Sequence, residues 1–395
     1  MNLQFRAVCV LACFCAISAL AQDSKSGPPK ATAAPKVISE AARIQALQEY
    51  WTPERLASAK PMPIPVVDPA SVVPNNAPLA PEPLHVGAGG WPTIHDAAQE
   101  TSAERIPLNR GDEAAPDAKP APDGFSYEMP FNSFRTNLST TYPYSAVGVL
   151  AFTIPPGTTQ PAGNYLCSAS VGPDNHTLIT ARHCTFDIGS SKWYQNWVFY
   201  PGWYNGKNNG LHGAWYPDVV LTWTSGSGVL SLTTGWDLAM MTMHDSTNRG
   251  CGGDSGYTIG QYTGWLGYTY GGSFSQRQWA IFGYPVVSPY TGQLLFQDDA
   301  ATGAVNPYGS TNVVEVGNPQ TAGISGGPWV IGFDPNDNAG PSLNNNTSPG
   351  YVNLNNGVNS FYWTSPNQPL AINGTIFQSS NFWNLYTALQ GYTCN

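Results

Sequence analysis

The chain has 395 residues, a length that allows two or three folded units of roughly 100–200 residues. Only 10% of the residues are charged and 12% are aromatic, while glycine (41) and proline (35) are abundant, which is typical of a β-rich, turn-rich protein. The formal net charge of −9 argues against a nucleic-acid binder, because no basic stripe is present to neutralise phosphates.

Residues 1–21 have the pattern of a secretory signal peptide. Arg6 precedes an apolar run over residues 7–20, and Ala19-Leu20-Ala21 supplies the small side chains of a signal-peptidase site. A membrane anchor is the alternative, but about 14 apolar residues are too few to span a bilayer. We expect a secreted protein that is cleaved near Ala21 and has no membrane contact afterwards.

Export leaves four cysteines for an oxidising compartment. Three of the seven lie in the signal peptide, and Cys167, Cys184, Cys251 and Cys394 remain. An even number suggests two disulfides, for which three pairings are possible.

Residues 22–124 are rich in proline and alanine, in stretches such as KPMPIPVVDP and APDAKPAPDG. This composition predicts an extended, poorly packed and largely irregular segment. A short helix is expected near residues 39–60, where apolar residues recur at helical spacing and Thr52-Pro53 fits an N-cap followed by proline at the first helical position. The segment is either a pro-segment or a linker, and the pattern leaves both open.

From residue 125 to residue 395, short apolar runs alternate with turn residues. Examples are AVGVLAFTI, TLITA, DVVLTWT, DLAMMTM, WAIFGYPV and GPWVIGF. Many short strands between turns predict an all-β sandwich or barrel. Only SSNFWNLYTALQGY, near the C-terminus, has a helical pattern, with Ser380 or Asn381 as the expected N-cap.

The stretch TARHC, residues 180–184, and the upstream stretch CSAS, residues 167–170, resemble the histidine motif of trypsin-like serine proteases and the strand before it. The resemblance implies that His183 is a general base and that Cys167 and Cys184 form a disulfide. A bridge beside a catalytic imidazole would hold it in place, and closing a loop of this size is worth roughly 3 kcal/mol. Cys251 and Cys394 would then pair with each other.

Asp237 opens the apolar run DLAMMTM and resembles the aspartate of the same family, which is followed by Leu-Ala. The resemblance implies that its carboxylate orients the imidazole of His183. A surface aspartate that caps a strand is the alternative. Asp245, beside His244, fits less well because it ends the run.

Two serines have surroundings like those of the family's nucleophile. Ser255 lies in CGGDSG, which has the family's aspartate, and Ser325 lies in GISGGP, which lacks it. In this family the second barrel is built between the aspartate and the serine. Ser255 follows Asp237 by 18 residues, too few for a barrel, whereas Ser325 follows it by 88. We therefore expect Ser325 to be the nucleophile, with the N–H groups of Gly323 and Ser325 as the oxyanion hole, and Ser255 to lie in a turn.

Departures from the family pattern bear on activation and specificity. Ile324 stands where trypsin-like enzymes have an aspartate that pairs with a newly freed α-amine, so activation here should act by removing a shielding pro-segment. The stretches TGWLGY and YPYSAVGVLAFT resemble glutamyl-endopeptidase-like relatives, yet all six histidines precede Ser325, so the histidine that binds the substrate carboxylate in those enzymes is missing. We expect an apolar or small side-chain pocket, with Ser360 supporting Asp237 from the strand that lines it.

The resemblance implies a chymotrypsin-like double six-stranded antiparallel β-barrel over residues 125–395, with a short C-terminal helix. It implies a secreted serine endopeptidase, made as a zymogen and acting on polypeptides as a monomer without a cofactor or nucleic acid. No metal site is expected, because the calcium-like loop at residues 334–340 lacks the sixth-position glycine and twelfth-position glutamate. A catalytically silent binding protein on this scaffold, suggested by 13 Trp and 20 Tyr, and an esterase with the same triad remain alternatives.

Overall fold

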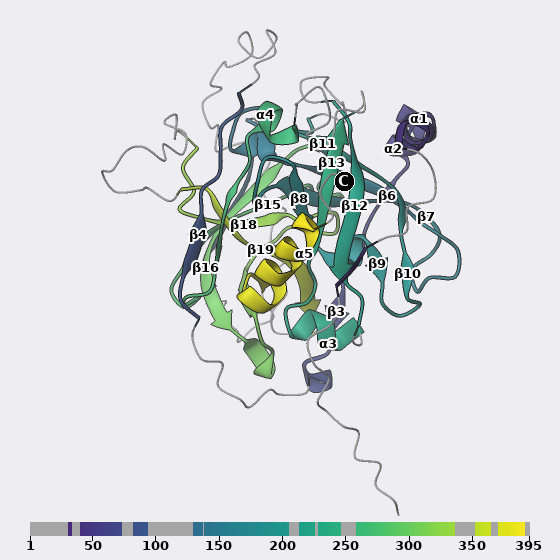
Figure 1. Cartoon of the computed structure of the whole chain (residues 1–395). Helices are drawn as coiled ribbons and strands as arrows, with labels where there is room; N and C mark the ends of the chain where they lie inside the picture. The colour runs from purple at the N-terminus through teal and green to yellow at the C-terminus, as the bar shows by residue number, and fades with distance from the viewer. Residues whose placement is uncertain are drawn as a thin grey trace, which may run out of the picture.

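The computed structural model describes residues 31–33, 40–72, 82–93, 129–136, 138–204, 213–225, 228–245, 258–335, 352–364 and 370–391. In this part the chain is mostly strand, with a few short helices (Figure 1). None of the helices in the described ranges is long and apolar enough to cross a bilayer.

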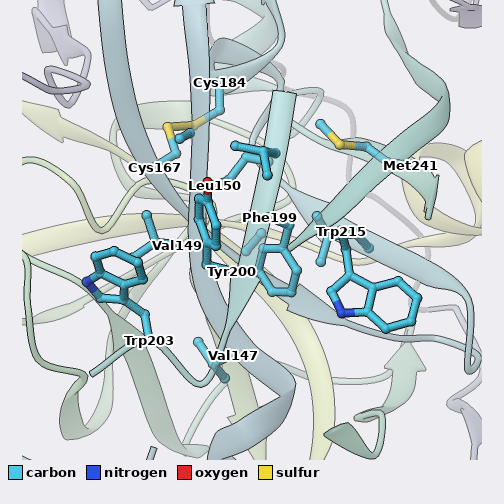
Figure 2. Close-up of a cluster of buried hydrophobic side chains, with 14 of the residues drawn as sticks. Val147, Val149, Leu150, Cys167, Cys184, Phe199, Tyr200, Trp203, Trp215 and Met241 are labelled. Atoms are coloured by element: carbon cyan, nitrogen blue, oxygen red, sulfur yellow. A yellow bond between two sulfur atoms is a disulfide. The ribbon is translucent and has the colours of Figure 1, made fainter. Parts of the chain in front are cut away.

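The first barrel is an antiparallel sheet in the order β12-β11-β6-β7-β8-β13, closed by the pairing of β13 with β12. Its strands are β6 (Val147–Ile154), β7 (Gly163–Val171), β8 (Thr177–Thr180), β11 (Gln195–Pro201), β12 (Trp215–Trp223) and β13 (Ala239–Asp245). Figure 2 shows part of the packed interior, where Leu150, Phe199 and Met241 are fully buried close to the disulfide between Cys167 and Cys184.

The second barrel follows the same plan in the order β18-β15-β16-β17-β20-β19, closed by the pairing of β18 with β19. Its strands are β15 (Gln278–Gly283), β16 (Phe296–Val305), β17 (Val313–Gly317), β18 (Pro328–Ile331), β19 (Leu354–Trp363) and β20 (Ala371–Ile376). Ile281, Val316, Trp329 and Ile372 form part of its core and are fully buried. These two closed six-stranded barrels confirm the predicted fold class.

Short strands, helices and turns lie outside the two six-stranded barrels. They are β5 (Phe131–Arg135), β9 (Phe186–Asp187), β10 (Lys192–Trp193), β14 (Gly267–Tyr270), α3 (Gly228–Thr233), α4 (Ile259–Thr263), and the 3₁₀ turns η1 (Pro69–Ser71), η2 (Tyr144–Ala146), η3 (Arg182–Cys184) and η4 (Pro307–Gly309).

The predicted C-terminal helix is present, but its N-cap was predicted wrongly. A π-helical turn, η5 (Ser379–Trp383), leads into α5 (Asn384–Gln390), and the N-cap is Gln378. Asn381 lies in the first turn and accepts a hydrogen bond from the Gln378 N–H at 2.7 Å. The N-cap therefore lies two residues before Ser380 and three before Asn381, and Leu385 and Leu389 bury the helix against the first barrel.

The N-terminal segment is extended, as expected, yet the expectation of poor packing was wrong for its described residues. It contains α1 (Glu40–Tyr50), α2 (Pro53–Ala57), β1 (Ala31–Ala33), β2 (Lys60–Pro61), β3 (Val66–Val67) and β4 (His85–Gly87). Thr52 caps α2 as predicted, accepting a hydrogen bond from the Arg55 N–H at 3.3 Å. Ile44 and Leu47 of α1 are buried in the core cluster of the first barrel. Burial of these apolar side chains stabilises the contact between the N-terminal segment and the barrel.

Each of these four short strands pairs with a strand of the barrel region. β1 pairs with β12, β2 with β7, β3 with β19 and β4 with β14. In Figure 1 the segment is coloured purple to blue: α1 and α2 lie beside the first barrel, β3 lies near α3, and β4 lies along the second barrel.

Candidate active site

His183 lies in η3, the turn that follows β8. Cys184, the next residue, is disulfide-bonded to Cys167 of β7, so the turn is tied to two strands of the first barrel. The side chain of His183 is 9% exposed. The sequence prediction of this disulfide agrees with the structure.

Asp237, just before β13, holds both the main chain and the ring of His183. Its Oδ1 accepts the His183 backbone N–H at 2.9 Å, and its Oδ2 lies 2.8 Å from Nδ1 of the ring. A carboxylate can only accept, so Nδ1 carries a hydrogen, and in the neutral form of the ring Nε2 then keeps its lone pair. Asp245, the weaker sequence candidate, ends β13 and so lies at the other end of that strand from Asp237.

The Asp237 carboxylate is fully buried and charged. Burial by itself raises its pKa, but attraction to and hydrogen bonding with His183, attraction to the buried Arg182, and a hydrogen bond from Ser360 together lower it to about 2. The Ser360 hydroxyl donates to Oδ2 at 2.6 Å, which is the supporting contact expected from the sequence. Arg182 was not anticipated, because nothing in its sequence position indicates that its charge lies inside.

Ser325 lies in the loop between β17 and β18, against the first barrel. Its carbonyl oxygen accepts the N–H of Ser168 at 2.8 Å and contacts Sγ of Cys184 at 3.7 Å. The loop that carries the expected nucleophile is thus attached to the same strand and the same disulfide that position His183.

Two glycines allow this close approach. Gly323 has φ of +107°, a conformation that side chains other than glycine rarely adopt. At Gly326 a Cβ atom would lie 2.6 Å from both the Ala181 nitrogen and the Ser168 carbonyl oxygen, so any side chain would push the loop away from the first barrel.

The loop is further held by Asn359, which sequence reasoning missed. Its side-chain amide donates to the carbonyls of Ile324 and Phe282, both at 3.1 Å, and accepts from the indole N–H of Trp329 at 2.7 Å. Its main chain also bonds Gly326 and Gly327 at 2.9 Å each. The only sequence signal was its place beside Ser360.

Ser168 makes a second unanticipated contact with the loop. Its hydroxyl donates to the Gly323 carbonyl at 2.9 Å and accepts the Tyr284 N–H at 2.9 Å. Within the described residues, the N–H groups of Gly323 and Ser325 donate no hydrogen bond, and their role as oxyanion donors stays a prediction.

The structure places the loop of Ser325 against the turn that carries His183, and the two side chains share no hydrogen bond. Among the residues that the structure describes, Nε2 of His183 and Oγ of Ser325 are both buried and have no hydrogen-bonding partner. Catalytic hydrogen bonds are often long before substrate binds, so this geometry is compatible with a serine–histidine pair.

Ile324 replaces the charged anchor of trypsin-like enzymes with apolar packing. Its side chain is fully buried in the core cluster of the second barrel and lies against Gly283. The sulfurs of Cys167 and Cys184 lie close to the His183 ring, but they are bonded to each other and so offer no thiolate to a metal.

Several sequence predictions fall outside the described residues. They concern the signal peptide at residues 1–21, Ser255, the Cys251–Cys394 pairing and most of the calcium-like loop. These remain predictions.

A comparison with protein-family models gave no match, and neither did a comparison with curated proteins. Among solved structures, the chain is similar to the protease Anisep from Arthrobacter nicotinovorans, at 22% identity over 65% of this chain and 98% of that one, with a TM-score of 0.48. It is similar to the thermostable serine protease AL20 from an extremophilic microorganism, at 23% identity over 62% and 96%, with a TM-score of 0.47. It is also similar to a Glu endopeptidase, at 14% identity over 66% and 96%, with a TM-score of 0.43. The strand pairing itself establishes that the chain has the chymotrypsin-like double-barrel fold, the fold of the trypsin-like serine proteases that its motifs resemble.

Proposed function

We propose that the protein is a secreted serine endopeptidase in which Ser325, His183 and Asp237 form the catalytic triad. The observation that carries this proposal is the hydrogen-bonded chain from Ser360 through Asp237 to the ring of His183, facing a serine loop that is bonded to the same part of the first barrel. Such a chain fixes an imidazole with its Nε2 free to accept a proton, which is what a serine nucleophile requires.

The reaction proceeds in two halves. Oγ of Ser325 attacks the peptide carbonyl carbon while Nε2 of His183 takes the hydroxyl proton, and the resulting oxyanion is held by the N–H groups of Gly323 and Ser325. The carbon–nitrogen bond then breaks as His183 returns the proton to the leaving amine, which gives an ester on Ser325. Water, deprotonated by His183, cleaves that ester and restores the hydroxyl group.

The charge of Asp237 supports both halves. With a pKa of about 2, the carboxylate stays ionised at neutral and mildly acidic pH, so it stabilises the imidazolium that forms in each half. Export through residues 1–21 and a second disulfide between Cys251 and Cys394 complete the proposal from the sequence.

A fluorophosphonate probe tests the proposal in the full chain, because it reacts only with an activated serine. We expect labelling of the wild type that is lost in Ser325→Ala and reduced on the order of 10⁴-fold or more in His183→Ala. Ser255→Ala is the matched control and should label like the wild type. Labelling that persists in Ser325→Ala, or is lost in Ser255→Ala, would overturn the assignment.

The two alternatives give other results. A silent binding protein would show no Ser325-dependent labelling in any variant. An esterase would label but would turn over ester and not peptide substrates, which a paired assay with the same acyl group separates.

A further inference from the structure

Residues 60–67 of the N-terminal segment are hydrogen-bonded to both barrels. β2 pairs in parallel with β7, and the N–H of Met62 donates to the Leu166 carbonyl at 2.9 Å. β3 pairs in parallel with β19, where the N–H of Tyr362 donates to the Pro65 carbonyl at 2.9 Å. The segment therefore crosses from one barrel to the other.

Both attachment points border the candidate active site. On the first barrel, Leu166 directly precedes Cys167, the partner of the cysteine beside His183. On the second barrel, Tyr362 lies two residues after Ser360, and its hydroxyl donates to the carbonyl of Gln320 in the serine loop at 2.6 Å.

The crossing is short. The three-residue step from Met62 to Pro65 can span at most about 11 Å. It therefore crosses directly from the strand that carries Cys167 to the strand that carries Ser360.

The side chains of this step point into the two cores. Met62 is 3% exposed and packs in the first-barrel cluster, whereas Ile64 is 7% exposed and belongs to the second-barrel cluster that contains Ile324. Pro63 and Val66 face solvent, and Val66 is 60% exposed. Burial alternates from Met62 to Ile64 as in a strand, and Val67 is buried again after the exposed Val66.

The candidate active site is closed. Nε2 of His183 and Oγ of Ser325, the two atoms that must reach a substrate, are buried without a partner in the described part of the chain. An active site that accepts a peptide has to expose these atoms.

We infer that residues 60–67 are a built-in inhibitory peptide, which occupies the strand edges of β7 and β19 where a peptide substrate would otherwise add. This inference rests on the proposed function. Pro61, Pro63 and Pro65 keep the segment extended, so little conformational entropy is lost when it seats. Covalent attachment to the same chain maintains a high effective concentration.

The test compares two aspartate substitutions in the full chain. Ile64→Asp places a charge in the apolar cluster and should release the segment, whereas Val66→Asp places the same charge on the exposed side of the same segment. We expect Ile64→Asp to raise the rate of Ser325 labelling by about tenfold to a hundredfold, and Val66→Asp to leave it unchanged. Ile64→Ala, which adds no charge, should give a smaller rise and guards against misfolding.

Two further measurements decide the interpretation. Hydrogen exchange at the Tyr362 and Thr364 amides, which bond Pro65 and Val67, should speed up in Ile64→Asp and not in Val66→Asp. A synthetic peptide of residues 58–70 should slow labelling of Ile64→Asp again, and the same peptide with aspartate in place of the isoleucine should not.

The inference is overturned if exchange shows that the segment is released while Ile64→Asp and the wild type label at equal rates. Failure of the proposed function gives a different pattern, in which no variant shows Ser325-dependent labelling even with the segment released. In that case the inference falls with it.

Discussion

Replacing Ile324 with aspartate tests how the nucleophile loop is held. The side chain of Ile324 is fully buried in the apolar cluster of the second barrel. Removing it loses roughly 2–3 kcal/mol of apolar burial. Keeping the new carboxyl neutral at pH 7 costs about 4 kcal/mol more, since its pKa would have to rise by about 3 units at about 1.4 kcal/mol each. The total of about 6 kcal/mol is comparable with the whole stability of many domains.

Urea unfolding and fluorophosphonate labelling measure the effect. We expect Ile324→Asp to unfold at much lower urea than the wild type, or not to fold at all, and to lose labelling of Ser325. Ile324→Val is the control, because it keeps the apolar contact and should cost only about 0.5–1.5 kcal/mol. An Ile324→Asp protein that is as stable as the wild type and labels as fast would show that the loop accepts a charged anchor, as in trypsin-like activation, and would refute the reasoning.

Two further predictions concern buried polar groups. Asn359→Ala leaves the buried indole N–H of Trp329 without its partner, at about 1–3 kcal/mol, and takes one hydrogen bond from each of two carbonyls, of which that of Ile324 keeps the Gly327 N–H; its midpoint in urea unfolding should therefore fall, and an unchanged midpoint would contradict the contacts described. Asp298 is fully buried, and burial followed by repulsion from Asp299 raises its pKa to about 8. The folded protein then holds a proton that the unfolded chain releases above pH 4, so stability should fall between about pH 4 and pH 8 by up to ~1.4 kcal/mol per pH unit. Asp298→Asn should flatten that part of the profile in unfolding measurements at pH 5 and pH 8, and an equally steep profile would show that the carboxyl is already ionised.

Candidate site residues that lie in short sequence motifs could be predicted from the sequence. His183, Asp237 and Ser325 each stand in a recognisable stretch, and their order and spacing required a barrel on either side of Asp237. Ser360 was found because it lies on a strand expected to line the pocket. Each of these predictions depends on a short sequence motif and on the number of residues between motifs, and both can be read without a structure.

Residues that act through non-local contacts could not be found in this way. Asn359 holds the serine loop by reaching a strand 77 residues earlier, at Phe282, and no periodicity marks it. Ser168 stands in the motif around Cys167, but its contact with Gly323 spans 155 residues. The packing of Ile64 could not be predicted from the sequence for the same reason. A proline-rich composition indicates that a segment is extended, but it does not indicate which strand the segment pairs with.

The way in which the serine loop is held also bears on what limits activity. In trypsin-like enzymes an aspartate beside the serine waits for a new α-amine, so cleavage orders the loop. Here neutral contacts already fix the loop in the uncut chain: Ile324 is packed inside, Asn359 binds its carbonyls, and Ser168 bonds the Gly323 carbonyl. On the proposed function, cleavage would have no loop to order and would act instead on access to Ser325, which we infer the segment from Lys60 to Val67 to control. Removing that segment should then change the rate at which Ser325 is labelled and leave the contacts of the serine loop as they are.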